Sequence, residues 1–200
     1  MLQAPLRRVT DPVTAPVAVY LARMRLSASL LTVMGFVAGL GAFATIATHH
    51  YWAGLGLIAA NRLLAGLDGP VARRTEATDF GAFLETATGI IAMASIPFGF
   101  ALAEPGRALA ASFLIFSFIA SGSTFLAFAA TAAKRNMAQR GAMPIHHPGG
   151  LIESTEVFLA LGLACVFPDW FSVIAYTLGT LCFATAGMRV AEGVARFGKP

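Results

Sequence analysis

The sequence predicts an all-α integral membrane protein: a bundle of six transmembrane helices preceded by a short interfacial helix. Hydrophobic residues make up 57% of the 200 residues, charged residues make up only 12%, and the mean hydropathy is +0.73. The 14 basic and 10 acidic side chains are too few to cover the surface of a water-soluble domain of this length. Uncharged runs long enough to cross about 30 Å of hydrocarbon also recur along the chain.

We treat the chain as a single membrane domain, residues 1–200, because no linker or internal repeat divides it. The predicted spans cover residues 26–48, 51–67, 80–103, 108–133, 151–167 and 170–188. The first span opens with Ser27, a residue type that often caps a helix. Cys165 and Cys182 both lie in apolar runs, where a thiol behaves as a small hydrophobe, so no redox or metal framework is indicated.

The positions of the basic residues predict the orientation in the membrane. Of the 14 Lys and Arg residues, 13 lie on the side of the chain termini and only Arg107 lies on the other side. By the positive-inside rule both termini are cytosolic, and we expect a bacterial inner-membrane location. Tyr51, Trp52 and Trp170 fall at the external helix ends, where an aromatic belt is expected. The net charge of +4 then reflects topology and attraction to anionic membrane lipid, and it does not support nucleic-acid binding.

Residues 1–25 precede the first span. Apolar residues and the basic Arg23 and Arg25 follow Pro12 and Pro16, and we predict a short helix lying on the cytosolic leaflet. A flexible tail is the alternative, which the two prolines favour. A cleaved signal peptide is not expected, because the apolar run is too long and begins too late.

Residues able to do chemistry gather in the hairpin between the second and third spans. The segment Asp68-Gly69-x-x-Ala72-Arg73 places a carboxylate, a backbone free to approach a ligand, a small residue and a guanidinium close together. An ionisable residue at a membrane is costly and is therefore a functional candidate. The alternative is a structural ion pair between Asp68 and Arg73 that fixes the hairpin.

Beyond it, the segment Gly81-x-x-x-Glu85-x-x-x-Gly89 places three residues on one helical face. Small residues on both sides of a carboxylate indicate room for a bulky ligand. Gly81 and Gly89 can equally serve close packing between helices, and so can Gly35-x-x-x-Gly39 in the first span, within the bundle or in a dimer.

Together these segments resemble the signature of the CDP-alcohol phosphatidyltransferases. That signature reads Asp-x-x-Asp-Gly-x-x-Ala-Arg, a spacer, and Gly-x-x-x-Asp-x-x-x-Asp. The matching residues are Asp68, Gly69, Ala72, Arg73 and Gly81. The six-helix topology, the cytosolic termini and the interfacial segment also resemble the family, so the likeness covers most of the chain.

The resemblance implies phospholipid synthesis, in which a phosphatidyl group passes from a CDP-linked lipid to an alcohol acceptor and CMP is released. In the family, four aspartates hold Mg²⁺ or Mn²⁺ against the diphosphate, and the last is also the base that deprotonates the acceptor. The resemblance further implies that Gly69, Ala72, Arg73 and Gly81 bind the substrate and that the protein is a homodimer.

Three of the four aspartate positions differ in this chain. Ala65 stands at the first and Gly89 at the last, the base position, and neither has a side-chain oxygen, while Glu85 replaces the third aspartate. Loss of a general base alone costs about 10² to 10⁴ in rate. We therefore predict a degenerate site in which Asp68 and Glu85 hold one Mg²⁺ or Mn²⁺ ion on a bound CDP group, with weak or absent turnover.

Two other functions stay open. One is a catalytically silent homologue that acts as a partner or regulatory subunit of an active synthase. The other is a small transporter using Glu85, Glu153 and Glu156 along its pathway, against which stand the short external turns and the lack of an inverted repeat.

The connection before the fifth span offers a further candidate wall for an acceptor site. Glu153 and Glu156 share one helical face, and His146 or His147 could contact a substrate beside them. The alternative is a hydrated helix end without a binding role.

Overall fold

The computed structural model describes residues 19–20, 27–72, 74, 78–135, 152 and 154–198. In these residues the regular elements are all helical and none is a strand, in agreement with the predicted all-α class. The α-helices that follow residue 27 are α2 (Ala28–Ala47), α3 (Tyr51–Ala72), α4 (Asp79–Ala103), α5 (Ala108–Lys134), α6 (Ser154–Val166) and α7 (Phe171–Phe197). Two single-turn 3-10 helices join them, η1 (Pro105–Arg107) and η2 (Pro168–Trp170).

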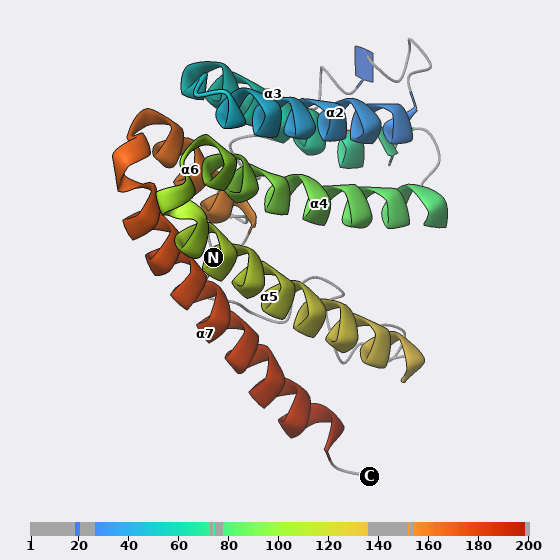
Figure 1. Cartoon of the computed structure of the whole chain (residues 1–200). Coiled ribbons are helices and arrows are strands. Elements are labelled where there is room, and N and C mark those ends of the chain that lie inside the picture. Colours follow the sequence, from blue (N-terminus) through green and yellow to red (C-terminus); the bar gives the residue numbers. More distant parts are fainter. Residues whose placement is uncertain are drawn as a thin grey trace.

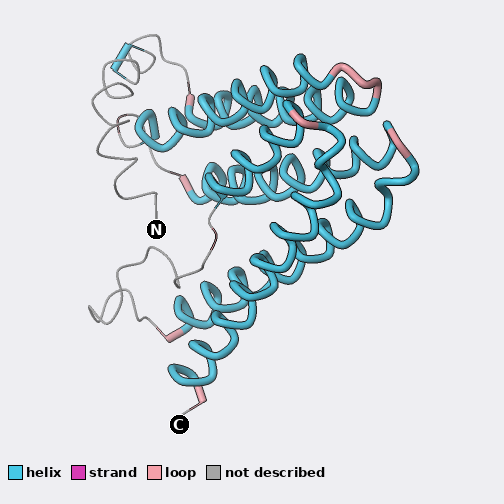
Figure 2. The backbone as a smooth tube through the Cα atoms, turned by 90° about the vertical axis from the view of Figure 1, so that its left-hand side faces the viewer, coloured by secondary structure: helices cyan, strands magenta, loops and turns pink. Residues whose placement is uncertain are grey.

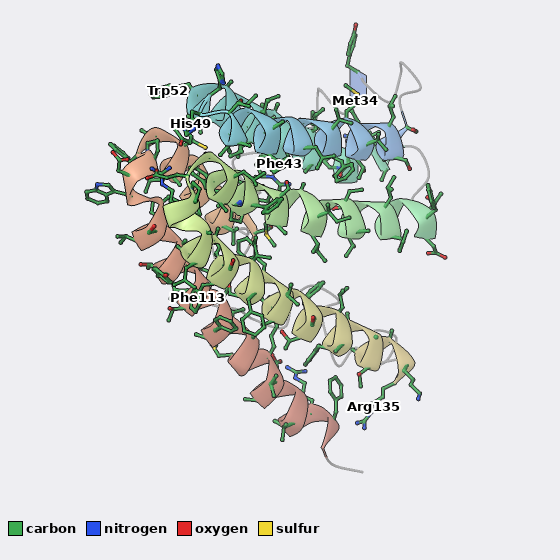
Figure 3. All side chains as sticks on the ribbon, viewed as in Figure 1. Met34, Phe43, His49, Trp52, Phe113 and Arg135 are labelled. Carbon is green, nitrogen blue, oxygen red and sulfur yellow. The ribbon has the colours of Figure 1, made fainter. Side chains whose placement is uncertain are left out.

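The helices form two groups that meet at one end of the molecule. α3 and α4 both pack on α2, while α5 packs along α7, and α6 lies against α3 and α7 (Figure 1). The α2–α3 turn, η1 and η2 all lie at the end where the groups meet, which we call the short-turn end (Figures 1 and 2). His49 and Trp52 mark this end, and Arg135 marks the opposite end, where the groups diverge (Figure 3).

Local sequence signals explain where helices begin. Ser27 caps α2, because its side-chain oxygen accepts the N–H of Leu30 at 3.2 Å. Thr78 caps α4 in the same way, accepting the N–H of Gly81 at 3.0 Å. The cap expected at Ser27 is thus confirmed.

Glycines let helices within each group approach closely. A Cβ built on Gly99 of α4 would lie 2.9 Å from the backbone carbonyl oxygen of Phe43 on α2. A Cβ on Gly179 of α7 would lie 2.6 Å from the ring of Phe113 on α5. A larger residue at Gly99 would press on the backbone of α2, and one at Gly179 would displace the Phe113 ring, so both glycines permit close packing of their helices.

At the short-turn end, aromatic rings are closely packed and the buried Arg107 has polar partners. The Tyr51, Phe100 and Phe171 rings stack in a row, with centroids 5.6 Å and 4.3 Å apart. Beside them Arg107, only 8% exposed, donates from Nη1 to the Tyr51 hydroxyl at 3.2 Å. Its Nη2 forms ion pairs with Glu104 at 2.7 Å and Asp169 at 3.3 Å. Arg107 thereby ties together the three short connections.

The described helices and the predicted spans differ in two respects. Four helical segments are long and apolar enough to cross a membrane: Ala28–Ala47, Asp79–Ala103, Pro105–Lys134 and Pro168–Phe197. α3 is not among them, since polar residues such as Asn61 and Asp68 lower its hydropathy. α6 has 13 residues, about 20 Å of helix, which is shorter than the hydrocarbon core.

The second difference is that α3 and α7 continue past residues 67 and 188, where the apolar runs end, to Ala72 and Phe197. An apolar run marks the part of a helix suited to hydrocarbon, and polar residues can extend the helix beyond it. In α7 the extension carries an ion pair between Glu192 and Arg196 at 2.8 Å. Of the predicted interfacial segment 1–25, only residues 19–20 are described, and they are helical.

Candidate functional site

A cavity of about 1120 Å³ lies between the two groups of helices, and all six helices contribute to its wall. Four of its wall residues occupy the positions singled out in the hairpin: Ala65 and Asp68 on α3, and Glu85 and Gly89 on α4. Their spacing of three on one helix and four on the next turns both members of each pair to the same side. The fold thus brings the four positions to one space.

Asp68 is the buried carboxylate of this cavity, with 4% of its surface exposed. Its Oδ1 accepts the N–H of Gly69 at 2.7 Å. Its Oδ2 lies 3.3 Å from the hydroxyl of Thr32 on α2, which also lies 3.1 Å from the Ala28 carbonyl oxygen and can donate to one of the two at a time. Asp68 is therefore held in place from both its own helix and α2.

Glu85 and Gly89 are the two signature positions that α4 contributes to the cavity wall. Glu85 is exposed, and its charge acts on both Asp68 and Arg62 through space. A Cβ built on Gly89 meets no atom of the described residues within 4 Å, so among these residues the space beside it is open. Gly89 therefore does not pack closely against another described helix of this chain, and the close-packing alternative considered for it finds no support within the described residues.

Asn61 and Arg62 form a polar chain that sequence analysis did not single out. Asn61, 4% exposed, donates from Nδ2 to the Gly35 carbonyl oxygen at 2.6 Å. Its Oδ1 accepts the Nε–H of Arg62 at 2.9 Å. The Arg62 guanidinium carbon lies 3.6 Å from the ring centroid of Phe158 on α6. An arginine in an apolar helix was the available signal, since such a charge is costly in a membrane.

Other predicted site residues lie away from the cavity wall or outside the described residues. Gly69 and Ala72 lie in the last turn of α3, and Gly81 belongs to the cap of α4, where its N–H bonds Thr78. None of the three lines the cavity. Arg73, Glu153, His146 and His147 fall outside the described residues.

The donor set limits which metal centre the cavity could hold. Among the described residues, no group of three or more His, Cys, Asp or Glu side chains could hold a metal ion together. Asp68 and Glu85 are the carboxylates of the described wall. Mg²⁺ is often bound by one or two carboxylates with phosphate oxygens of a substrate. The residues therefore fit one ion shared with a phosphorylated ligand, and they do not supply four carboxylates for a pair of ions.

The rest of the cavity is elongated, and most of its wall is apolar. From Asp68 its wall follows α3 back to Leu55, about 20 Å along the helix. Apolar residues line this part, including Ile58, Leu163 and Val166. A space with charged groups at one end and a long apolar wall suits an amphiphilic ligand.

Known proteins resemble this chain in sequence or in fold. The family model described as CDP-alcohol phosphatidyltransferase matches residues 25–185. Inner membrane protein YnjF of Escherichia coli K12 is 46% identical over 166 residues, which are 82% of this chain and 81% of that protein.

Two solved structures of Mycobacterium tuberculosis phosphatidylinositol phosphate synthase (PgsA1) also resemble the chain, each at 23% identity, which shows the fold alone. The one with CDP-DAG bound has a TM-score of 0.65 and covers 90% of this chain and 92% of its own. The one in complex with manganese and citrate has a TM-score of 0.64 and covers 89% and 87%.

Proposed function

The chain is a membrane protein of the CDP-alcohol phosphatidyltransferase family, and from that premise we propose that it binds a CDP-linked lipid in the cavity while its transfer to an alcohol is weak or absent. One observation carries the proposal. The four signature positions line one cavity, and two of them, Ala65 and Gly89, have no side-chain oxygen.

The shape and charge of the cavity support lipid binding. A CDP-linked lipid has a charged diphosphate at one end and acyl chains at the other, as the cavity has charged and apolar ends. In this proposal Asp68 and Glu85 hold one Mg²⁺ or Mn²⁺ ion on the diphosphate, which would neutralise phosphoryl charge. Gly69, Ala72, Arg73 and Gly81 remain proposed substrate-binding residues because they match the signature.

The missing oxygens support slow or absent chemistry. Transfer requires the acceptor hydroxyl to lose its proton as its oxygen attacks phosphorus and the bond to CMP breaks. Gly89 offers no base for that proton, and Ala65 offers no oxygen to position an ion. Because no described residue lies within 4 Å of a Cβ built on Gly89, an aspartate placed there would meet no obstructing atom of the described helices near its Cβ.

We further propose that all six helices cross a bacterial inner membrane with both termini cytosolic. The ends of α5 and α7, which carry Lys134 and Arg196, lie together at the end opposite the short turns. Trp52 and Trp170 are exposed at the short-turn end, as expected of interfacial anchors. α3 and α6, which line the cavity together with the other four helices, would then cross with them.

A homodimer is also proposed, on the family resemblance. Gly35 and Gly39 are buried within one chain, and a Cβ on Gly39 would lie 2.8 Å from Cβ of Ala92. These glycines pack α2 inside the bundle, so a dimer contact would use another surface.

The test is CMP release by the purified protein with CDP-diacylglycerol, Mg²⁺ or Mn²⁺, and a panel of acceptor alcohols. We expect little or no release from the native chain and clear release from the variant Ala65→Asp, Glu85→Asp, Gly89→Asp. Native release that Asp68→Ala abolishes would overturn the degenerate-site proposal.

The same two missing oxygens favour the second candidate, a silent partner or regulatory subunit. It predicts that Asp68→Ala leaves the cellular phenotype unchanged, while a packing change such as Gly99→Val abolishes it. Loss of phenotype with Asp68→Ala would exclude this candidate.

A further inference from the structure

Arg62 is a cationic side chain in the cavity wall, one turn and a half along α3 from Asp68. A charge placed among apolar helices is expensive unless it is paired or used. Arg62 is not an exposed surface residue that could extend into water, so its position requires a physical explanation.

Neighbouring residues hold the Arg62 guanidinium without neutralising it. Asn61 is fixed to the Gly35 carbonyl of α2 and accepts the Nε–H of Arg62. Phe158 of α6 supports the guanidinium through its ring face. Three helices therefore determine where this group lies.

The terminal nitrogens of Arg62 remain available. In the part of the chain that the structure describes, they form no hydrogen bond and no ion pair. Asp68 and Glu85 attract the guanidinium only through space. The other arginine of the wall, Arg189, differs, because it donates to the carbonyl and hydroxyl oxygens of Ser121 at 2.9 Å and 3.0 Å.

The charges of the described wall are balanced without a metal ion. Its charged side chains are Arg62, Arg189, Asp68 and Glu85, with opposite formal charges in equal number. The four aspartates of the family signature would repel a diphosphate unless cations neutralised them. The wall of this chain has two carboxylates instead, together with the positive charge of Arg62. A guanidinium binds two phosphoryl oxygens at once through its planar fork.

We propose that Arg62 binds a phosphoryl group of the ligand directly and that this contact does not require a divalent cation. This proposal shares one assumption with the proposed function, namely that a phosphorylated ligand binds in the cavity. The phosphoryl group could belong to the diphosphate of the lipid or to a phosphorylated acceptor.

The test measures the dissociation constants of dioctanoyl CDP-diacylglycerol and, separately, of glycerol 3-phosphate for the purified full-length protein. Each is measured in EDTA and in Mg²⁺. We expect the native chain to bind at least one ligand in EDTA. We expect Arg62→Gln to weaken that binding about tenfold to a hundredfold in both conditions, as for other lost charged hydrogen bonds.

Arg74→Gln is the matched control, because Arg74 is exposed and does not line the cavity. It removes the same charge and should change the dissociation constant by less than about twofold. An equal effect of both substitutions would show a general charge effect and overturn the proposal.

Two further variants keep the test decisive if Arg62→Gln fails to fold. Arg62→Lys keeps the charge but loses the planar fork, and Phe158→Leu removes the supporting ring; we expect each to weaken binding several-fold. Native affinity in both would overturn the proposal.

The remaining outcomes separate the two proposals. If the native chain binds the CDP-lipid only with Mg²⁺, and Arg62→Gln has no effect, this inference fails and the proposed function stands. If Arg62→Gln weakens only glycerol 3-phosphate binding, Arg62 is assigned to the acceptor phosphate. If the native chain binds neither ligand in any condition, the proposed function fails with it.

Discussion

Two arginines, Arg107 at the short-turn end and Arg62 in the cavity, show how differently the two regions are built. Arg107 meets a hydroxyl and two carboxylates within 3.3 Å, and stacked aromatic rings fill the space beside it. Arg62 has an amide oxygen and an aromatic face, and no carboxylate within ion-pair distance among the described residues. The first region is paired and packed, while the second keeps charge and space for a ligand.

The largest expected effect on stability comes from a larger side chain at a close contact between helices, compared with the same change in the cavity wall. Gly99→Val should lower the free energy of unfolding by about 1–3 kcal/mol or more, because its Cβ would press on the Phe43 backbone carbonyl. Gly89→Val, on the same helix, should have a much smaller effect, because no atom of the described residues lies within 4 Å of its Cβ. Thermal unfolding in detergent measures both. Equal destabilisation would remove the distinction between the regions.

A second comparison replaces each arginine by an apolar residue of similar length. Arg107→Met should lower the free energy of unfolding by about 1–2 kcal/mol, since it breaks three contacts, of which the two to carboxylates are weakened by the solvent exposure of Glu104 and Asp169. Arg62→Met should leave the melting temperature unchanged or raise it, because it removes a half-buried charge that has no ion-pair partner among the described residues. Unfolding curves of the two variants, measured in parallel, test the sign. A large loss with Arg62→Met would make Arg62 a structural residue.

The smallest effect concerns the carboxylate of the cavity. Thr32→Val removes the hydroxyl that lies 3.3 Å from Asp68 Oδ2 and keeps the side-chain shape. Because that hydroxyl is shared with the Ala28 carbonyl, we expect a loss of about 0.5–1 kcal/mol in the free energy of unfolding. Thr45→Val is the control, since Thr45 bonds only carbonyl oxygens of its own helix. An equal loss in both would show that the Thr32 contact to Asp68 adds nothing.

Much of the fold could be predicted from the sequence, because apolar runs and a capping serine are local signals. Ser27 caps α2 as expected, and the helices lie where the apolar runs predict them. The far ends of α3 and α7 could not be predicted in this way, since ion pairs such as Glu192 with Arg196 extend a helix beyond its apolar run.

In the site, too, the residues with local sequence signals could be predicted, and the contact between distant segments could not. Ala65, Asp68, Glu85 and Gly89 could be placed together because each pair has helical spacing and one short hairpin joins the helices. The contact between Arg62 and Phe158 joins residues from distant parts of the sequence, through the packing of α6 on α3. No local pattern encodes that packing, so the role of Arg62 became visible only in three dimensions.

The central claim is that this chain retains binding and lacks the oxygens for chemistry. The most direct measurement determines, on the same preparations, CDP-lipid affinity and CMP release for the native chain and for the variant Ala65→Asp, Glu85→Asp, Gly89→Asp. We predict dissociation constants that agree within a few-fold and rates of CMP release that differ by about 10² or more. Equal rates of release, or a native chain that binds no CDP-lipid while the variant does, would contradict the account.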